Sequence, residues 1–232
     1  MSSVSVCMAT HKGESFLRQQ IDSILVQLEP GDELVISDDN PSDEVSPVLS
    51  SYRDSRIKVL PKRYFGSPAR NFEYTLASAS HDLIFLADQD DVWYTQKIQV
   101  MREKLREVDL AICDCRLADH QLRTISPSFF KSNRSRPGLF WNLFRSSYVG
   151  CCMAFHRRVL EKALPFPDFI QLHDQWIGLV AERYFRVSFI PQILVDHRRH
   201  HSNYSSTGGQ SKNSIKKKLK LRFHLAKRLF FQ

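Results

Sequence analysis

The sequence has no run of about 20 apolar residues, the length that a membrane-spanning helix needs. Its first ten residues, MSSVSVCMAT, lack the basic start and the apolar core of a signal peptide. We therefore expect neither an integral membrane protein nor a secreted one. The chain has 232 residues, of which 42% are hydrophobic. That length and composition fit one large domain with a full core and at most a short appendage.

Cysteines are few, and their number and spacing do not suit a disulfide framework. There are five: Cys7, Cys113, Cys115, Cys151 and Cys152. Because neighbouring cysteines make poor partners for each other, reduced thiols in a cytoplasm are expected. Zinc sites prefer wider ligand spacing than either close pair offers, which favours buried core cysteines over metal ligands.

Acidic residues are absent from residues 212–228, and this absence explains the net charge of +8. The stretch holds eight basic residues, and the rest of the chain has 25 basic and 25 acidic ones. The eight are Lys212, Lys216, Lys217, Lys218, Lys220, Arg222, Lys227 and Arg228. A neutral body with a basic tail suggests an anionic surface as the partner and argues against nucleic acid bound by the fold.

The same tail has helical periodicity. Apolar residues fall near one face: Ile215, Leu219, Ala226 and Phe230, with Phe223 and Leu229 adjoining. A basic amphipathic helix can lie among anionic lipid headgroups, which attract it by about 1 kcal/mol per Lys or Arg. We expect such a helix here, behind a Ser- and Gly-rich linker at 202–214. A helix packed back on the body and a disordered segment are the alternatives.

The first half of the chain alternates apolar strands with helices. Strands are expected at 4–9, 33–37, 56–60, 82–87 and 110–113, and helices at 14–28, 41–52, 67–78 and 95–106. This rhythm predicts an α/β fold with a mostly parallel central sheet covered by helices on both faces. The second half is less regular. There, strands are expected at 148–155, 187–190 and 193–196, and helices at 139–144, 159–164 and 172–184.

Polar residues follow three of these strands where each one ends. They are Thr10-His11, Asp38-Asp39 and the run Asp88-Gln89-Asp90-Asp91. Ligands of parallel α/β sheets bind beyond the carboxyl ends of the strands, so these positions predict a nucleotide-type site. Three carboxylates within four residues are best tolerated where a divalent cation neutralises them, and oxygen ligands suit Mg²⁺ and Mn²⁺. A solvated turn in which Asp91 caps the next helix is the alternative.

A series of motifs makes a family resemblance specific. In chain order they are Thr10-His11-Lys12-Gly13, Ser37-Asp38-Asp39, Ala69-Arg70-Asn71-Phe72, FLADQDDVW at 85–93, GCCMAF at 150–155, LHDQW at 172–176 and HRRHHSN at 197–203. This series resembles the family 2 glycosyltransferases, and within them the members that build lipopolysaccharide or capsule with rhamnosyl, galactosyl or glucosyl units. His197 departs from the pattern, because an aromatic residue is common there, and His11-Lys12 replaces a common Tyr-Asn.

The resemblance implies a GT-A, Rossmann-like fold and inverting, metal-dependent transfer from a UDP- or dTDP-sugar to a lipid-linked or oligosaccharide acceptor. It implies a glycosyltransferase domain at 1–205, with a nucleotide-sugar-binding half at 1–115 and an acceptor and catalytic half at 116–205. Residues 206–232 would form the linker and membrane-associating tail. The expected place is the cytoplasmic, inner face of a bacterial membrane, in surface polysaccharide or lipopolysaccharide (O-antigen or capsule) biosynthesis.

Individual roles carry over from the same motifs. The resemblance implies that Thr10 and Asp39 hold the nucleotide base with His11 and Asp38 beside them, that Arg70 and Asn71 line the donor pocket, that Asp88 contacts the ribose, and that Arg198 and His200 lie near the diphosphate. It assigns Asp90, supported by Asp91, to Mn²⁺ or Mg²⁺, and Asp174 to general-base catalysis, with His173 and Trp176 on the acceptor side.

The chemistry independently requires a base of the Asp174 kind. A sugar hydroxyl is a poor nucleophile, so a carboxylate must take its proton as the C–O bond forms. Asp174 opens a predicted helix next to Trp176, whose flat face suits a sugar ring. Capping of that helix is the competing interpretation, and the two roles are compatible. A zinc site built from His197, His200, His201 and His173 is disfavoured, because neighbouring strand residues point to opposite faces.

Two other functions remain as alternatives. Asp88-x-Asp90 after an apolar strand is also similar to the first motif of haloacid-dehalogenase-like phosphatases, although that motif usually lies on a domain's first strand. A non-catalytic nucleotide-sugar-binding module would need no base. A nucleotidyltransferase is disfavoured because no Gly-rich phosphate loop follows the first strand. We also expect residues 202–210 to act as a lid that orders on donor binding.

Overall fold

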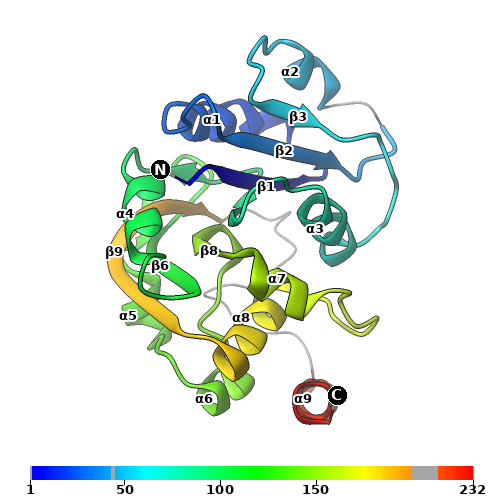
Figure 1. The fold of residues 1–232 in the computed structure, drawn as a ribbon, viewed down its shortest axis with the longest axis vertical. Helices are drawn as coiled ribbons and strands as arrows, with labels where there is room; N and C mark the ends of the chain where they lie inside the picture. Colours follow the sequence, from blue (N-terminus) through cyan, green and yellow to red (C-terminus); the bar gives the residue numbers. More distant parts are fainter. Residues whose placement is uncertain (1, 43–44, 200–213, 232) are drawn as a thin grey trace.

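The computed structural model describes residues 2–42, 45–199 and 214–231, and its centre is one mixed sheet of nine strands (Figure 1). Eight strands follow the order β3-β2-β1-β4-β8-β6-β9-β5, and β7 pairs with β6. Among the predicted residues that now lie outside the described ranges are His200 and the proposed lid at 202–210. Nearly all of the linker at 202–214 lies outside them too.

The first four strands of the sheet confirm the predicted parallel arrangement. They are β1 (Val4–Thr10), β2 (Glu33–Asp38), β3 (Ile57–Val59) and β4 (Leu83–Asp88). β1 lies between β2 and β4 and is parallel to both. Almost every residue of these three strands is buried, as expected of parallel strands that are covered on both faces. The helices that connect them are α1 (Glu14–Leu25), α2 (Ser46–Ser50) and α3 (Pro68–Ala77).

Beyond β4 the prediction of a mostly parallel sheet is wrong. β8 (Met153–His156) lies between β4 and β6 (Leu110–Ala118) and is antiparallel to both. β9 (Val187–Arg198) is parallel to β6, whereas β5 (Val92–Trp93) and β7 (Thr124–Ser126) pair in antiparallel fashion with β9 and β6. The apolar pattern of a short buried strand carries no information on its direction, so the sequence could not distinguish these cases.

The elements of the second half also differ in extent from the expected ones. The strand expected at 148–155 is shorter, because Gly150–Cys152 forms a 3₁₀ turn, η1. The two strands expected at 187–190 and 193–196 are one long, curved strand, β9, which lies between β6 and β5 in the sheet (Figure 1). The remaining helices are α4 (Lys97–Lys104), α5 (Phe129–Asn133), α6 (Leu139–Phe144), α7 (Arg157–Ala163) and α8 (His173–Tyr184).

The C-terminal helix α9 (Ile215–Phe230) packs on the body of the protein. Leu225 and Leu229 are 2% exposed, and the Tyr184 hydroxyl of α8 donates a hydrogen bond to the Leu229 carbonyl oxygen at 3.2 Å. Phe223 of α9 and Phe231, the residue after the helix, remain exposed. Helix α9 therefore both docks on α6 and α8, as one alternative proposed, and presents apolar side chains outward. In the described part of the chain, no helix is long and apolar enough to cross a membrane.

Candidate active site

The carboxyl ends of β1, β2 and β4 meet at one edge of the sheet. Thr10 pairs in register with Asp38 of β2, and Ala9 pairs with Asp88 of β4. The three polar clusters that follow these strands therefore lie side by side, as the parallel order predicts. This edge holds most of the residues to which the sequence assigned donor and metal binding.

Asn71 joins the ends of β1 and β2 from helix α3. Its side-chain amide donates to the carbonyl oxygens of Thr10 at 3.1 Å and Ser37 at 3.3 Å. The Thr10 hydroxyl donates to Asp38 Oδ1 at 2.9 Å, and burial raises the pKa of the Asp38 carboxyl. Asn71 is 2% exposed, and among the described residues its Oδ1 has no hydrogen-bond partner. An unpaired buried acceptor at this edge suits a ligand that donates a hydrogen bond.

Asp39 holds the loop that leads into α3. Its carboxylate accepts hydrogen bonds from the backbone N–H groups of Phe65, Gly66 and Ser67, the last two at 3.1 and 3.2 Å. The Nδ1 atom of the exposed His11 lies 2.9 Å from the Asp39 carbonyl oxygen. In this structure the Asp39 side chain thus shapes the wall of the candidate nucleotide site, and its contact with a base stays a prediction.

Gln89, which the sequence reading did not single out, links the acidic loop to the end of β1. Its Oε1 accepts the His11 backbone N–H at 2.7 Å, and its Nε2 donates to the His11 carbonyl oxygen at 2.8 Å. A Cβ atom on Gly13 would lie 2.2 Å from the Gln89 side chain, so the glycine leaves room for this pair. The sequence signal for Gln89 was its place in the DQDD motif, where it is the non-acidic second residue.

The carboxylates of the acidic loop affect one another through their charges. Burial, and then the charges of Asp91 and Asp90, raise the pKa of Asp88 well above its usual range. Asp91 is fully buried, and its Oδ1 accepts hydrogen bonds from His197 Nδ1 and from the Arg198 backbone N–H, each at 2.9 Å. Because α4 begins only at Lys97, the alternative in which Asp91 caps that helix is wrong.

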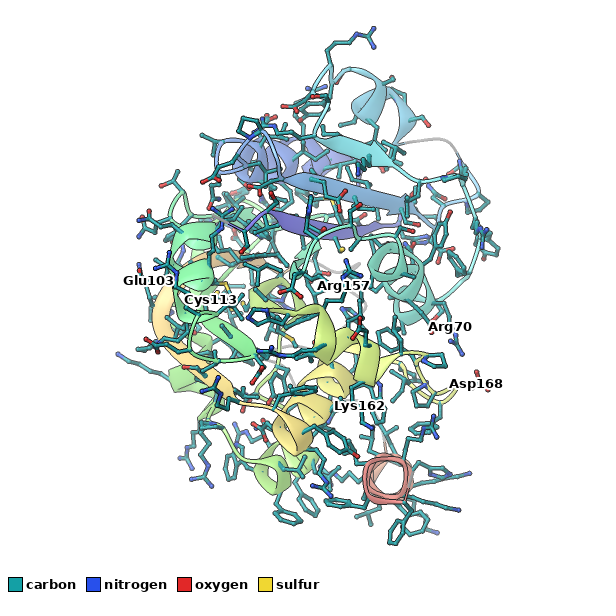
Figure 2. All side chains as sticks on the ribbon, viewed as in Figure 1. Arg70, Glu103, Cys113, Arg157, Lys162 and Asp168 are labelled. Carbon is teal, nitrogen blue, oxygen red and sulfur yellow. The ribbon has the colours of Figure 1, made fainter. Side chains whose placement is uncertain are left out.

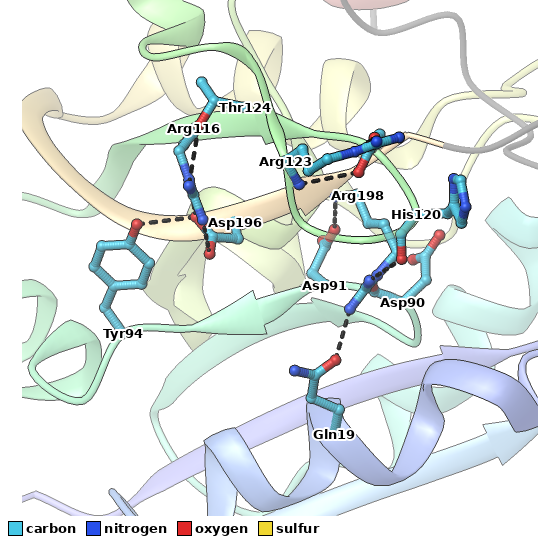
Figure 3. Close-up of polar contacts among 11 residues, drawn as sticks. Gln19, Asp90, Asp91, Tyr94, Arg116, His120, Arg123, Thr124, Asp196 and Arg198 are labelled. Atoms are coloured by element: carbon cyan, nitrogen blue, oxygen red, sulfur yellow. Dashed lines mark hydrogen bonds and ion pairs between the residues drawn. The ribbon is translucent and has the colours of Figure 1, made fainter.

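Arg198 lies in the interior beside the acidic loop (Figure 3). Its guanidinium donates to the carbonyl oxygens of Asp90 at 2.7 Å and His120 at 2.6 Å, and to Gln19 Oε1 at 2.7 Å. The side chain is 3% exposed. These bonds fix the acidic loop against β9 and α1. Contact between Arg198 and a diphosphate stays a prediction, as does that of His200, which lies outside the described residues.

Arg70 does not join the group at the strand ends. Its guanidinium bonds Glu73 and the exposed Asp168, and donates to the Phe166 carbonyl oxygen at 3.3 Å. Figure 2 shows Arg70 and Asp168 on the same side of the molecule. The arginine therefore ties α3 to the loop before α8. Donor contact by Arg70 stays a prediction.

Asp174 lies in the first turn of α8, where the candidate base was expected. Its Oδ1 accepts the Gln175 backbone N–H at 2.7 Å, and the Gly150 backbone N–H also bonds the carboxylate. Burial raises the pKa of Asp174 to about 6 against these hydrogen bonds. A Cβ on Gly150 would lie 3.7 Å from Asp174 Cβ, and the next residue, Cys151, clusters with Asp88 and Asp91, so the acceptor half brings Asp174 near the acidic loop. A carboxylate with a pKa near neutrality suits general-base work.

The two aromatic residues beside Asp174 are core residues. Trp176 is 2% exposed, and its indole N–H donates to the Ala163 carbonyl oxygen at 2.9 Å. The His173 ring stacks on Phe72 with centroids 3.8 Å apart, and burial lowers its pKa to about 3. Both rings thus fill the space between α8 and its neighbours instead of presenting an open face to a sugar. The helical period that leaves Asp174 partly accessible turns Trp176, two residues on, into the core.

Lys97 is a second residue that the sequence reading missed. It is 0% exposed, its Nζ donates to the Cys151 carbonyl oxygen at 2.6 Å, and it lies 3.3 Å above the Trp93 ring. Burial lowers its pKa. The hydrogen bond from Lys97 joins α4 to η1, which contains Cys151 and Cys152. All five cysteines are buried and free, as predicted. Nothing in the spacing of a single Lys on a helix would have distinguished it from a solvated one.

Comparison with known proteins gives a consistent picture. The model of a family described as "Glycosyl transferase family 2" matches residues 5–164. A UDP-Glc:alpha-D-GlcNAc-diphosphoundecaprenol beta-1,3-glucosyltransferase, WfgD of Escherichia coli, is 24% identical over 76% of this chain and 68% of its own length. The dTDP-rhamnosyl transferase RfbG of Shigella flexneri is 32% identical over 40% of this chain and 34% of its own length. The chain thus spans between a third and about two thirds of these relatives.

Two solved structures have the same fold. The S. aureus TarS 1–349 complex with UDP-GlcNAc superposes with a TM-score of 0.75 at 16% identity, covering 98% of this chain and 67% of TarS. The mannosyltransferase PcManGT from Pyrobaculum calidifontis, in complex with GDP-Man and Mn²⁺, gives a TM-score of 0.66 at 16% identity, covering 97% of this chain and 69% of that one. These similarities confirm the GT-A fold expected from the sequence.

Proposed function

Because this chain belongs to glycosyltransferase family 2 and is a glycosyltransferase, we propose that it transfers a sugar, with inversion, from a nucleotide-diphospho donor to a glycan hydroxyl. One observation carries the proposal. The acidic loop at 88–91 and the buried carboxylate of Asp174 come from opposite halves of the chain and meet at η1, where a Cβ on Gly150 would lie 3.7 Å from Asp174 Cβ and Cys151 clusters with Asp88 and Asp91. Inverting transfer needs this arrangement, in which a base faces the side that holds the cation and the leaving group.

The nucleotide would lie at the ends of β1 and β2, on Thr10, Asp38 and Asn71, with the ribose toward Asp88. The unpaired Oδ1 of Asn71 and the raised pKa of Asp38 support a polar ligand there. We propose a UDP- or dTDP-linked sugar as the donor. The names of the Escherichia coli and Shigella relatives contain these two pyrimidine nucleotides, and TarS was solved with UDP-GlcNAc.

A divalent cation fits the acidic loop. Asp91 and Asp90 both raise the pKa of Asp88, so a positive charge among the three carboxylates would relieve their repulsion. We propose that Asp90 ligates Mn²⁺ or Mg²⁺ and that Asp91 supports the loop from behind through His197 and Arg198. When bound, the cation would stabilise negative charge on the diphosphate leaving group.

Asp174 would act as the base. With its pKa near 6 it is deprotonated at neutral pH and can accept the proton of the acceptor hydroxyl as the new bond forms. The backbone N–H groups of Gln175 and Gly150 hold its carboxylate in one orientation. His173 and Trp176 contribute by fixing the first turns of α8 against the core.

We propose a lipid-linked acceptor in bacterial surface polysaccharide or lipopolysaccharide synthesis, used at the inner face of the cell membrane. The name of the Escherichia coli relative contains a diphosphoundecaprenol acceptor. On this chain, exposed Phe223 lies on α9, a helix with basic residues along its length, and exposed Phe231 follows its last residue. Exposed Phe140 of the neighbouring α6 stacks near Phe230. Such a surface suits anionic lipid headgroups.

The deciding experiment is calorimetry of UDP-, dTDP- and GDP-sugars with and without Mn²⁺. We expect one pyrimidine-nucleotide sugar to bind with metal and the Asp90→Ala variant to lose that binding. Glu103→Ala, an exposed carboxylate on α4 (Figure 2), is the matched control and should bind as the wild type does. Absence of binding for every nucleotide sugar in the presence of metal would overturn the proposed function.

A further inference from the structure

Four side chains with metal-binding groups meet on the inner side of the acidic loop. They are Asp88 at the end of β4, Asp91 in the turn after it, Cys151 in η1 and His197 on β9, and one donor atom of each lies within 4.8 Å of the other three. Asp91, Cys151 and His197 are buried, and Asp88 is half-buried. Sequence spacing could not reveal this group, because each of three distant segments supplies only one or two members.

His197 Nδ1 contacts two other members of the group. It is 2.9 Å from Asp91 Oδ1 and 3.6 Å from Cys151 Sγ. Within the part of the chain that the structure describes, Asp91 Oδ2 is buried and has no hydrogen-bond partner. A buried polar atom without a partner is destabilising, and a cation coordinated by that carboxylate would remove this destabilisation.

We propose that Asp88, Asp91, Cys151 and His197 form a binding site for a thiophilic divalent cation of the Zn²⁺ or Co²⁺ class. Two carboxylate oxygens, one imidazole nitrogen and one thiolate make a four-ligand set that suits tetrahedral Zn²⁺. Mg²⁺ requires six ligands in octahedral geometry and prefers oxygen, so this set excludes it. Binding breaks the Cys151 S–H bond and displaces the proton shared at His197 Nδ1, and both protons pass to solvent.

The charges of this site balance when the cation is bound. Asp88, Asp91 and the Cys151 thiolate carry three negative charges. The Lys97 ammonium, which donates to the Cys151 carbonyl oxygen at 2.6 Å, supplies one positive charge, and the divalent cation supplies two. A neutral group is the form in which buried charges are least costly. The buried Lys97 ammonium thus helps to balance the charge of the cation-bound site.

This thiolate site differs from the proposed Mn²⁺ or Mg²⁺ position at Asp90 in its donors and in its location. Asp90 is not one of its four ligands, and Cys151 and His197 reach the group from the acceptor half of the chain. The cation would therefore join β4, η1 and β9 without any nucleotide. The proposal does not depend on the transfer reaction.

Cobalt absorption tests the site directly. The full chain, treated with a chelator and freed of it, is titrated with Co²⁺ in the absence of nucleotide. We expect a thiolate-to-cobalt charge-transfer band in the near ultraviolet and strong visible bands of tetrahedral cobalt, both removed by an equivalent of Zn²⁺ and unaffected by excess Mg²⁺. Cys151→Ser should abolish the charge-transfer band. Cys7→Ser is the control, because Cys7 is equally buried on β1 and is not one of the four ligands.

A second variant and a second measurement keep failures separate. His197→Phe, which places an aromatic side chain at 197, should lower the Co²⁺ affinity at least tenfold while its circular dichroism stays native. No thiolate band in the wild type, or an unchanged band in a folded Cys151→Ser protein, overturns the proposal. Calorimetry of the same Cys151→Ser protein with the nucleotide-sugar donor and Mn²⁺ reports on the proposed function independently, since the Asp90 position keeps its ligand.

Discussion

Lys97 donates a hydrogen bond to the carbonyl oxygen of Cys151 at 2.6 Å, and this bond anchors η1. The same turn contains Gly150, whose backbone N–H bonds the Asp174 carboxylate. Lys97, a fully buried cation on α4, is thus connected to the candidate base Asp174 through Cys151 and Gly150. Displacement of a catalytic group by about 1 Å can cost about 10²-fold in rate, so the anchor matters for catalysis.

Lys97→Met therefore separates catalysis from stability. The variant keeps an apolar stem of similar volume, and replacement of a buried charge by an apolar group is often neutral or stabilising. We expect kcat to fall by about tenfold to 10²-fold, as expected of a displaced catalytic group, with an unchanged or higher melting temperature and unchanged donor affinity. Lys104→Met, at a less buried position on the same helix, is the control. An unchanged kcat in Lys97→Met would show that η1 needs no anchor.

Removal of the candidate base gives the second prediction. Asp174→Asn keeps the shape of the side chain and its acceptor oxygen for the Gln175 and Gly150 N–H groups but cannot take a proton. General-base catalysis contributes about 10²–10⁴-fold, and we expect kcat to fall within that range. Donor affinity measured by calorimetry should stay within about twofold of wild type, since the acceptor half supplies this residue. A large loss of donor binding would assign Asp174 to the donor site instead.

The pH profile of kcat/KM tests the same residue without substitution. Burial raises the pKa of Asp174 to about 6. A base acts only when deprotonated, so activity should be level above that pH and should fall about tenfold per pH unit below it. The acid limb should be missing from the residual activity of Asp174→Asn. A limb that persists in the variant belongs to another group.

Much of the donor side of this arrangement could be predicted from the sequence. The strands that end at Thr10, Asp38 and Asp88 are continuous apolar runs, which buried parallel strands require, and the polar residues after each run predicted the cluster that the structure brings together. The ordered motifs then supplied the family and the candidate base. These signals are local in sequence, and the structure preserves them.

Other features depend on contacts that are not local. The direction of β8 leaves no trace in its side-chain pattern, and the three backbone donors to Asp39 come from a loop 26 to 28 residues away. Trp176 was expected on a surface because of its chemistry, but its place on α8 faces the core. Cys151 and His197 were judged by spacing within their own segments, whereas η1 and β9 bring them together.

The link between Gly13 and Gln89 makes a double-mutant prediction. A methyl group at Gly13 would overlap the Gln89 side chain, so Gly13→Ala should break the bonds to the His11 backbone and lower donor affinity about tenfold, or by about 1.4 kcal/mol. In a Gln89→Ala background the methyl group has room, and the same change should add almost nothing. Equal effects in both backgrounds, measured by calorimetry, would contradict the proposed clash.

The outward face of α9 gives the last prediction, for vesicle binding. Phe223 on α9 and Phe231 directly after it are 66% and 83% exposed, and the helix has no acidic residues. Full burial of a Phe side chain in an apolar phase is worth about 1.5–3 kcal/mol, so Phe223→Ala together with Phe231→Ala should weaken binding to phosphatidylglycerol vesicles by well over tenfold. Tyr64→Ala is the matched control, because Tyr64 is 69% exposed and lies in the loop between β3 and α3, outside α9. High salt should weaken the wild-type interaction, since it screens attraction between the basic residues and the headgroups. Cosedimentation that is equal for the double variant and the wild type would mean that α9 serves only to cover α6 and α8.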